Sequence, residues 1–441
     1  MKSLLLVLIP ATATAGGMVL PIHGVHATER AGALIAGSED PDALWLDPAG
    51  LAHLREGTAV LVDAAYVDQR IDYARIDSGD NQLAAVSNQY PGIAIPTLAA
   101  AYRMPGGLVL AGGVTAPYAG IGKYDGDATR YSSISLAESA FVNLTVGAAY
   151  SPLRGLRVGL TATDTITMLK SQVALSGCPG QTICAPEDPD FDAPTKVDAT
   201  DLFAPSAGAG IQYDITPRVT IAASGTTPTY VRAHGTVATR LPSSAYFEGA
   251  MVMGNQIEVS FTLPATTKFG IEVRPDDHLR IEAALDVEYW SEHKSMKLTT
   301  SDVYIANAAG VGMYQLSPIT IPRHYKTSYA PSIGGEYRLG KLQVGAGYSY
   351  ETAAAPKAYV SAMTVDSAKH IIGLGGGYTI NGWDVGAAFA FVKLADVDLS
   401  LADARVPQLT PLRNQPSEIY VNAGQYRSTY LVGGVRASRR F

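Results

Sequence analysis

The chain has 441 residues, a net charge of −7 and only 17% charged side chains. A nucleic-acid-binding surface needs an excess of basic residues, so this acidic, weakly charged composition excludes that function class. A chain with 44 glycines and 24 tyrosines, and otherwise rich in Ala, Val and Thr, is typical of strands rather than helices.

The N-terminus has the pattern of a secretory signal. Lys2 precedes a short apolar run, residues 4–9, and Ala13-Thr14-Ala15 has the small-x-small form of a cleavage site. We therefore expect residues 1–15 to be removed and the mature chain to begin near Gly16. A buried N-terminal strand is the alternative for this segment. No later run of apolar residues is long enough for a membrane-spanning helix, but an exported chain can still cross a membrane as a β-barrel.

Residues 16–56 are mixed in composition and lack strand alternation, whereas from residue 57 onward strand-like runs alternate with connections. In residues 325–339 every second side chain, starting at Tyr325 and including Ile333, is mainly apolar or aromatic. The side chains between them, such as Lys326 and Glu336, are polar or small. Successive side chains of a strand point to opposite faces, so this run predicts one apolar face and one polar face. We count fourteen such runs: 57–76, 90–103, 108–118, 136–151, 156–171, 200–214, 218–231, 257–274, 279–299, 325–339, 342–352, 368–380, 383–396 and 427–441.

The connections alternate between short turns and long loops. The shortest turns are Gly340-Lys341 and Asn381-Gly382, and Asn-Gly is typical of a two-residue hairpin. Short turns at one end and long loops at the other favour an all-β, fourteen-stranded antiparallel transmembrane barrel over a soluble sandwich. We assign residues 57–441 to this barrel and residues 16–56 to a hatch, an N-terminal plug inside it. The chain ends on Phe441, and a terminal aromatic residue is common in such barrels.

The third predicted strand carries a signal for an interrupted wall. Pro117 has no N–H for the ladder, and the pair Gly112-Gly113 weakens a strand or marks close backbone approach. The sequence therefore predicts an interruption of the wall at this strand.

Cys178 and Cys184 lie six residues apart in a Pro/Gly/Asp-rich stretch. In an exported protein this spacing predicts a disulfide that closes a small loop. A metal site is the alternative, but no histidine or third cysteine is near. We predict no metal and no cofactor.

Three patterns suggest an enzyme or a metal site only weakly. The run Gly373 to Gly377 continues into a strand rather than a helix, so we interpret its glycines as room for a plug, not as a nucleotide loop. His293 and Ser295 share a strand face, but no third group that would orient a catalytic base is evident. His23 and His26 in the hatch are interpreted as hydrogen-bonded structure. We therefore predict that the chain is not an enzyme.

Several segments together resemble the FadL family of outer-membrane transporters for long-chain fatty acids and other hydrophobic compounds. Residues 47–50, Asp-Pro-Ala-Gly, are similar to the Asn-Pro-Ala signature of the family's hatch. The other segments that carry the resemblance are 114–118, 130–131, 263–270, 289–291, 345–351, 356 and 370–378. The resemblance implies a fourteen-stranded barrel in the outer membrane of a Gram-negative-type cell. It implies diffusive uptake, with ligand caught by outer loops and released sideways through a kink in the third strand.

The resemblance also implies roles for particular residues. The hatch signature is Asp47, Pro48, Ala49 and Gly50, and the lateral opening is expected at Gly112, Gly113, Pro117 and Tyr118. The resemblance implies that the signature packs against the third strand at this opening. First capture of a hydrophobe is assigned to loop side chains Tyr246, Phe247, Met251 and Met253, because flexible Met suits varied apolar ligands. Partners for a ligand carboxylate are Lys170, Lys294 and Lys297, although strict alternation from Leu279 turns Lys297 outward and Lys294 inward.

The chain departs from the family at Asp47, where an amide is replaced by a carboxyl group. An arginine expected near Met168 is absent, so fatty acids and neutral hydrocarbons both stay open as ligands. The predicted partners are a hydrophobic small molecule and membrane lipid, with the protein acting as a monomer. The alternatives are a general aqueous porin, which should lack a plug, and an outer-membrane lipid hydrolase.

Overall fold

The computed structural model describes residues 24–120, 122–136, 138–180, 182–300, 302–308, 312–412 and 418–441. The expected signal sequence, residues 1–15, and the first part of the expected hatch, residues 16–23, lie outside these ranges. Within them, no helix is long and apolar enough to cross a membrane.

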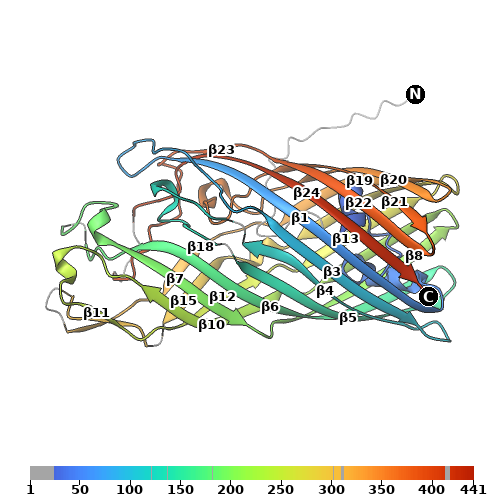
Figure 1. Cartoon of the computed structure of the whole chain (residues 1–441), viewed down its shortest axis with the longest axis horizontal. Coiled ribbons are helices and arrows are strands. Elements are labelled where there is room, and N and C mark those ends of the chain that lie inside the picture. Colours follow the sequence, from blue (N-terminus) through green and yellow to red (C-terminus); the bar gives the residue numbers. More distant parts are fainter. Residues whose placement is uncertain are drawn as a thin grey trace, which may run out of the picture.

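Fourteen strands of the described chain form a closed antiparallel ring, as the alternating runs predict (Figure 1). The ring closes because β1 pairs with the last strand, β24, from Ala59–Arg440 to Arg75–Gly424. In chain order the wall consists of β1 (Gly57–Arg75), β3 (Ile93–Arg103), β4 (Val109–Gly120), β5 (Ser139–Leu153), β6 (Leu156–Ser176), β8 (Pro205–Thr216), β9 (Val219–Thr226), β13 (Thr266–Val273), β14 (Leu279–Glu288), β19 (Ser328–Leu339), β20 (Leu342–Glu351), β21 (Lys369–Ile380), β22 (Trp383–Leu394) and β24 (Gly424–Arg440).

Alternation along the strands separates an apolar outer surface from a polar interior. On β19, Ile333 and Tyr337 are 54% and 40% exposed on the outside, whereas Ser328 and Glu336 are 1% and 4% exposed. Tyr325 does not follow the expected pattern. It precedes the first residue of β19, and its ring packs inside the barrel, 5.9 Å from that of Trp290. The alternation therefore holds only from the residue at which the strand begins.

One side of the wall is taller than expected. Segments 172–199 and 232–256 were expected to be long loops, but they contain the end of β6, the strand β7 (Asp192–Asp201) and part of β10 (Thr229–Thr239). With β12 (Gln256–Leu263), β15 (Ser295–Thr300) and β18 (Ile319–Pro322), these strands prolong the sheet beyond β6. A proline lies at each break between a strand of the fourteen-stranded ring and a strand of this extension, at Pro205, Pro228 and Pro264. Proline cannot donate a hydrogen bond to a ladder, so it is suited to such a break.

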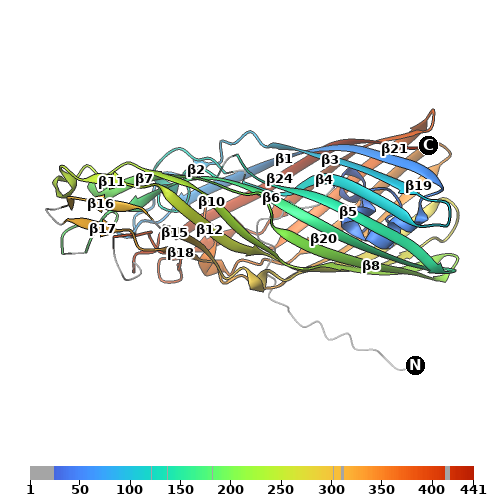
Figure 2. The same ribbon diagram turned by 90° about the horizontal axis from the view of Figure 1, so that it is seen from below.

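The two ends of the barrel differ, as Figures 1 and 2 show. The C-terminus and the short turns, such as Gly340-Lys341, lie at one end, here called the turn end. The opposite, loop end carries a small sheet of β11 (Met251–Met253), β16 (Tyr304–Ala306) and β17 (Met313–Gln315). It also carries the predicted disulfide between Cys178 and Cys184, which is present. The remaining short elements are β2 (Val86–Ser87), β23 (Val397–Leu399), η2 (Asp127–Thr129), η3 (Pro189–Phe191), η4 (Ala245–Phe247), η5 (Trp290–Glu292) and η7 (Lys357–Tyr359).

The hatch, residues 24–56 of the described chain, lies inside the barrel at the turn end (Figure 2). It contains α1 (Val25–Glu29), α2 (Ala43–Leu46) and η1 (Pro48–His53). Gly347 and Gly373 point at its backbone, and a Cβ at either position would collide with Arg30 or Thr28. Glycines thus let the hatch lie directly against the wall, as we interpreted the run that begins at Gly373.

Candidate functional site

The hatch signature packs against a different part of the wall than expected. Asp47 caps η1 by accepting a 3.0 Å hydrogen bond from the Ala49 amide. Asp47 and Pro48 lie directly against Gly210 of β8 and Gly159 of β6, where any Cβ would clash. The signature therefore does not lie mainly on the third strand, β4, because the glycines that admit its backbone are on β6 and β8.

Trp45, two residues before the signature, makes the contact with β4. Its indole ring fills the space beside Gly113, and its Nε1–H donates to Thr145 Oγ1 at 3.0 Å. A Cβ at Gly112, which alternates to the other face, would meet Thr145 and Val146 of β5 but no described hatch atom within 4 Å. The expected meeting of hatch and third strand thus occurs, but through an aromatic side chain that the sequence did not single out.

The wall is interrupted between β3 and β4. Their ladder ends at Leu98–Val114, while β3 continues to Ile93 with β1 as its only ladder partner. On its other side, β4 bulges where it pairs with β5. Thr115 pairs with Asn143 and Tyr118 with Phe141, so residues 116 and 117 of β4 lie opposite the single residue 142 of β5. Such a bulge bends a strand away from its neighbour. Pro117 lies within the bulge, where its missing N–H is tolerated.

An interior cavity of about 140 Å³ lies beside the hatch and reaches this interruption. Its apolar and aromatic lining residues are Leu44, Trp45, Leu46, Pro48, Pro117, Tyr118 and Pro264. The rest of its surface is unusually rich in hydroxyl groups, from Thr97, Thr115, Thr161, Thr163, Thr165, Ser206, Ser224, Thr226, Thr227, Thr229 and Thr266. Its charged lining residues are Asp42, Lys268, Asp286 and Glu288.

The three lysines expected to meet a ligand carboxylate do not line this cavity. Lys170 is on the outside of β6, where its ammonium group lies 2.9 Å from Glu138. Lys297 is exposed between Met296 and Leu298, which pack inward, and Lys294 is exposed in the turn before β15. The alternation of side chains that begins at Leu279 predicts an inward Lys294. It does not extend that far, because η5 interrupts the strand before Lys294. The lysine that lines the cavity is Lys268, 3.4 Å from Asp286.

The expected capture residues divide into two groups. Phe247 is only 5% exposed and packs on Phe191, with ring centroids 6.2 Å apart, beside the disulfide. It stabilises the loop end rather than forming its surface, and Tyr246 is partly buried on the same cluster. Met251 and Met253 are 57% and 46% exposed on β11. They are therefore the two expected capture residues that a ligand can reach.

Buried ions fix the hatch to the barrel. Glu282 of β14 accepts hydrogen bonds from three successive hatch amides, Ile35 at 2.6 Å, Ala36 at 2.8 Å and Gly37 at 2.9 Å. Arg30 lies between Glu282 and Glu272, with one 3.3 Å contact to each carboxylate, and all three side chains are fully buried. Breaking a buried ionic contact of this kind is costly, so the geometry anchors this part of the hatch.

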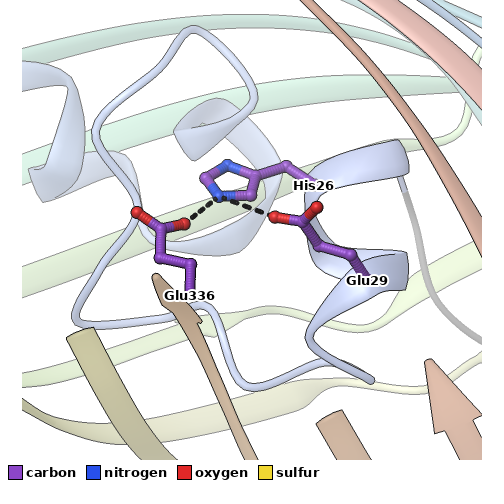
Figure 3. Close-up of side chains that lie close together, drawn as sticks. All are labelled: His26, Glu29 and Glu336. Atoms are coloured by element: carbon purple, nitrogen blue, oxygen red, sulfur yellow. Dashed lines mark hydrogen bonds and ion pairs between the residues drawn. The ribbon is translucent and has the colours of Figure 1, made fainter. Parts of the chain in front are cut away.

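A second cluster joins α1 to β19 (Figure 3). His26 Nε2 lies 3.0 Å from Glu336 Oε2 and 3.6 Å from Glu29 Oε1. Burial opposes protonation of the imidazole, but the hydrogen bond to Glu336 raises the pKa of His26 above its ordinary value. The three ligand atoms lie within 4.8 Å of one another and could hold a divalent cation. Arg280 also contacts Glu336, at 3.5 Å, and its positive charge disfavours a cation there.

The histidine weighed as a catalytic base is part of the aromatic core. His293 Nδ1–H donates to the Thr262 carbonyl at 2.7 Å, and its ring packs against Phe261, Trp290 and Tyr325. It is 1% exposed, whereas a base must be able to reach a substrate.

Asp47, which replaces the family's asparagine, is fully buried. Burial raises the pKa of Asp47 to about 7, opposed by the Ala49 hydrogen bond. In its protonated form the carboxyl group is neutral like the amide it replaces, and it can donate a proton.

Sequence reasoning missed Trp45, Arg30, Glu282 and Lys268. Arg30, which directly precedes the apolar hatch run 31–36, is a local signal that could have indicated a buried ion pair. Nothing local identifies its partners, which lie more than 240 residues away along the chain.

The fold and sequence can now be compared with known proteins. A family model described as "Outer membrane protein transport protein (OMPP1/FadL/TodX)" matches residues 6–429. A Pseudomonas aeruginosa FadL homologue has a similar structure, with a TM-score of 0.79 and 16% identity over 97% of this chain and 100% of that chain. The P. putida toluene transporter TodX gives a TM-score of 0.67 at 17% identity, over 96% of this chain and 99% of TodX. The monoaromatic hydrocarbon channel CymD gives 0.65 at 16% identity, over 95% and 97%.

No curated protein is similar to the chain in sequence. At these identities the structural likeness establishes the fold, and the family model, which spans nearly the whole chain, establishes the family. The chain belongs to the FadL/TodX family of outer-membrane transport proteins.

Proposed function

We propose that this protein is a channel for diffusive uptake of hydrophobic small molecules, which leave the barrel sideways between β3 and β4. The observation that carries the proposal is the continuity between the interior cavity and the wall interruption. Thr97 and Thr115 directly follow Leu98–Val114, the last paired residues of β3 and β4. They line the cavity and also lie at the edge of the interruption. A hydrophobic ligand gains free energy by moving from this opening into lipid rather than into water.

The hatch supports a lateral route over a direct one. It occupies the periplasmic end, which carries the short turns, and buried ions such as the Arg30–Glu282 pair hold it there. Exit through that end would require these contacts to break, whereas the opening beside Trp45 leaves them intact. The outer loops, where Met251 and Met253 are exposed, are suited to first capture. We take the working unit to be a monomer, because pairing of β1 with β24 completes the barrel wall within a single chain.

A general aqueous porin is the second candidate, and conductance distinguishes the two. A porin needs a water-filled lumen open at both ends. The hatch side chains and the buried ions beneath the cavity oppose such a path. We expect no steady ion conductance from the protein in planar bilayers, together with uptake of a radiolabelled hydrocarbon by cells that express it.

The test of the lateral route is deletion of Pro117. The deletion removes the extra residue between Thr115 and Tyr118, so β4 regains one-to-one register with β5. Without the bulge, β4 should straighten toward residues 93–97 of β3, which pair with β1 but not with β4. Hydrocarbon uptake should fall to the level of cells without the protein, while the barrel still folds and inserts.

The matched control is deletion of Ile215, the extra residue in the bulge between Asp214 and Thr216 at the periplasmic turn. This deletion should leave uptake unchanged. If the Pro117 deletion gives folded protein that transports like the wild type, the β3–β4 opening is not the exit.

A further inference from the structure

The cavity lining is unsuited to an anionic ligand. Lys268 is its one basic side chain among the described lining residues, and it already lies 3.4 Å from Asp286. Asp42 and Glu288 are also in the lining, so three carboxyl groups face the space beside a single ammonium group. A ligand carboxylate would meet like charge without a free counter-ion, and like charges in contact oppose binding.

The same groups are suited to a ligand that donates a hydrogen bond. Asp286 Oδ1 is buried and has no hydrogen-bond partner among the described residues. An unmade hydrogen bond at a buried acceptor is costly. The Asp286 side chain as a whole is 30% exposed, so a small rotation of its carboxyl group would bring this oxygen to the surface, where a ligand hydroxyl group would supply the missing hydrogen bond. Glu288 is positioned as a second acceptor next to it on the same strand face, held by a 2.6 Å hydrogen bond from Trp290 Nε1.

The hydroxyl lining adds neutral polar contacts around these acceptors. Thr226 and Thr266 face each other at 2.9 Å, and Thr97 and Thr115 at 3.0 Å. Each hydroxyl pair satisfies itself when the cavity is empty and can still accept from a ligand, because a hydroxyl oxygen has two lone pairs. A fully apolar ligand would leave these groups without new partners.

The carboxyl groups of β14 and the wall opening lie on different parts of the ring. Trp45, Pro117 and Tyr118 are at the opening, on the hatch and β4. Asp286 and Glu288 are on β14, which β5, β6, β8, β9 and β13 separate from β4 in the ring. A ligand can therefore direct its apolar part toward the exit and its polar end toward β14.

We propose that the cavity selects a neutral amphiphile whose polar end donates a hydrogen bond, such as a long-chain alcohol or an alkylphenol, over a carboxylate or a plain hydrocarbon. The proposal rests on the proposed function and names its substrate class. Asp286 is the main acceptor of the ligand hydroxyl, Glu288 the second, and Lys268 balances their charge rather than binding ligand.

The test compares three radiolabelled probes of equal chain length, dodecanol, dodecanoate and dodecane, for binding to the protein in lipid nanodiscs at neutral pH. Partition into empty nanodiscs is subtracted. We expect dodecanol to bind at least about tenfold more tightly than either other probe, since one good hydrogen bond to a charged group is worth that factor or more. Asp286→Asn combined with Glu288→Gln should weaken dodecanol and strengthen dodecanoate. Glu258→Gln, on the exposed part of β12 outside the cavity lining, is the control and should change neither.

Three results would overturn the inference. Tighter binding of dodecanoate than dodecanol, lost in Lys268→Gln, would make the cavity a fatty-acid site with Lys268 as the counter-ion. Equal binding of all three probes to the wild-type protein would mean that the polar lining does not select. In both cases the uptake function stands. If no probe binds, the proposed function fails as well. The comparison on wild-type protein decides these outcomes even if a variant does not fold.

Discussion

Glu282→Gln tests how the hatch is held in the barrel. The wild-type carboxylate uses Oε1 for the Ile35 and Ala36 amides and Oε2 for Gly37 and Arg30. A glutamine keeps the shape, but one of its two terminal atoms becomes an NH₂ group that cannot accept. At least one hatch amide then faces a donor, and Arg30 keeps only Glu272 as a counter-ion.

The expected loss is about 3 kcal/mol, because each hydrogen bond to a charged group contributes roughly 1.5–3 kcal/mol and the arginine becomes incompletely paired. Hydrogen exchange followed by mass spectrometry measures this on hatch peptides. If the hatch opens locally, exchange of the amides of residues 35–37 should accelerate roughly a hundredfold, while strand amides stay protected.

Two comparisons make the hatch result specific. Adding Arg30→Met to Glu282→Gln removes the incompletely paired cation and should recover part of the protection. Glu258→Gln, a barrel carboxylate with 38% side-chain exposure that lies outside the hatch contacts, should leave hatch exchange unchanged. If the amides of residues 35–37 exchange in Glu282→Gln as slowly as in the wild type, Glu282 does not hold the hatch.

The remaining predictions concern the barrel surface, the hatch signature and the loop end. Ile333→Arg on the outside of β19 should destabilise the barrel by roughly 2–4 kcal/mol near the bilayer centre. Refolding titrations measure this, and a larger loss from Ser332→Arg would mean that the faces are inverted. Because burial raises the folded-state pKa of Asp47 to about 7, above its unfolded value of about 3.9, its protonated form stabilises the hatch at low pH. Hatch stability should then fall by up to about 1.4 kcal/mol per unit as pH rises from about 4 to about 7, and a hatch-opening titration that remains unchanged in Asp47→Asn would contradict this. Cys178→Ser combined with Cys184→Ser should increase proteolysis at the loop end without unfolding the barrel, and identical cleavage rates would show that the disulfide does not restrain that loop.

The sequence by itself determined the barrel. Period-two alternation, six short turns and the long loops between them already predict fourteen strands, because a strand that crosses between lipid and lumen must alternate its side chains. The same reasoning indicated an irregular strand at Pro117, where β4 bulges, since a missing N–H is a property of the residue itself. The disulfide also followed from local spacing and export.

Only the tertiary structure decided which residues meet inside. Trp45 reaches Gly113, and Arg30 reaches Glu272 and Glu282, through contacts between segments far apart in sequence. Alternation indicates that Lys268 and Asp286 share the interior, but not which cavity they line or that they lie opposite each other on paired strands. It failed outright at Tyr325, because a break in a strand resets the side-chain phase and no local pattern marks that break. Ring closure and the position of the hatch fix these contacts, and both are properties of the whole chain.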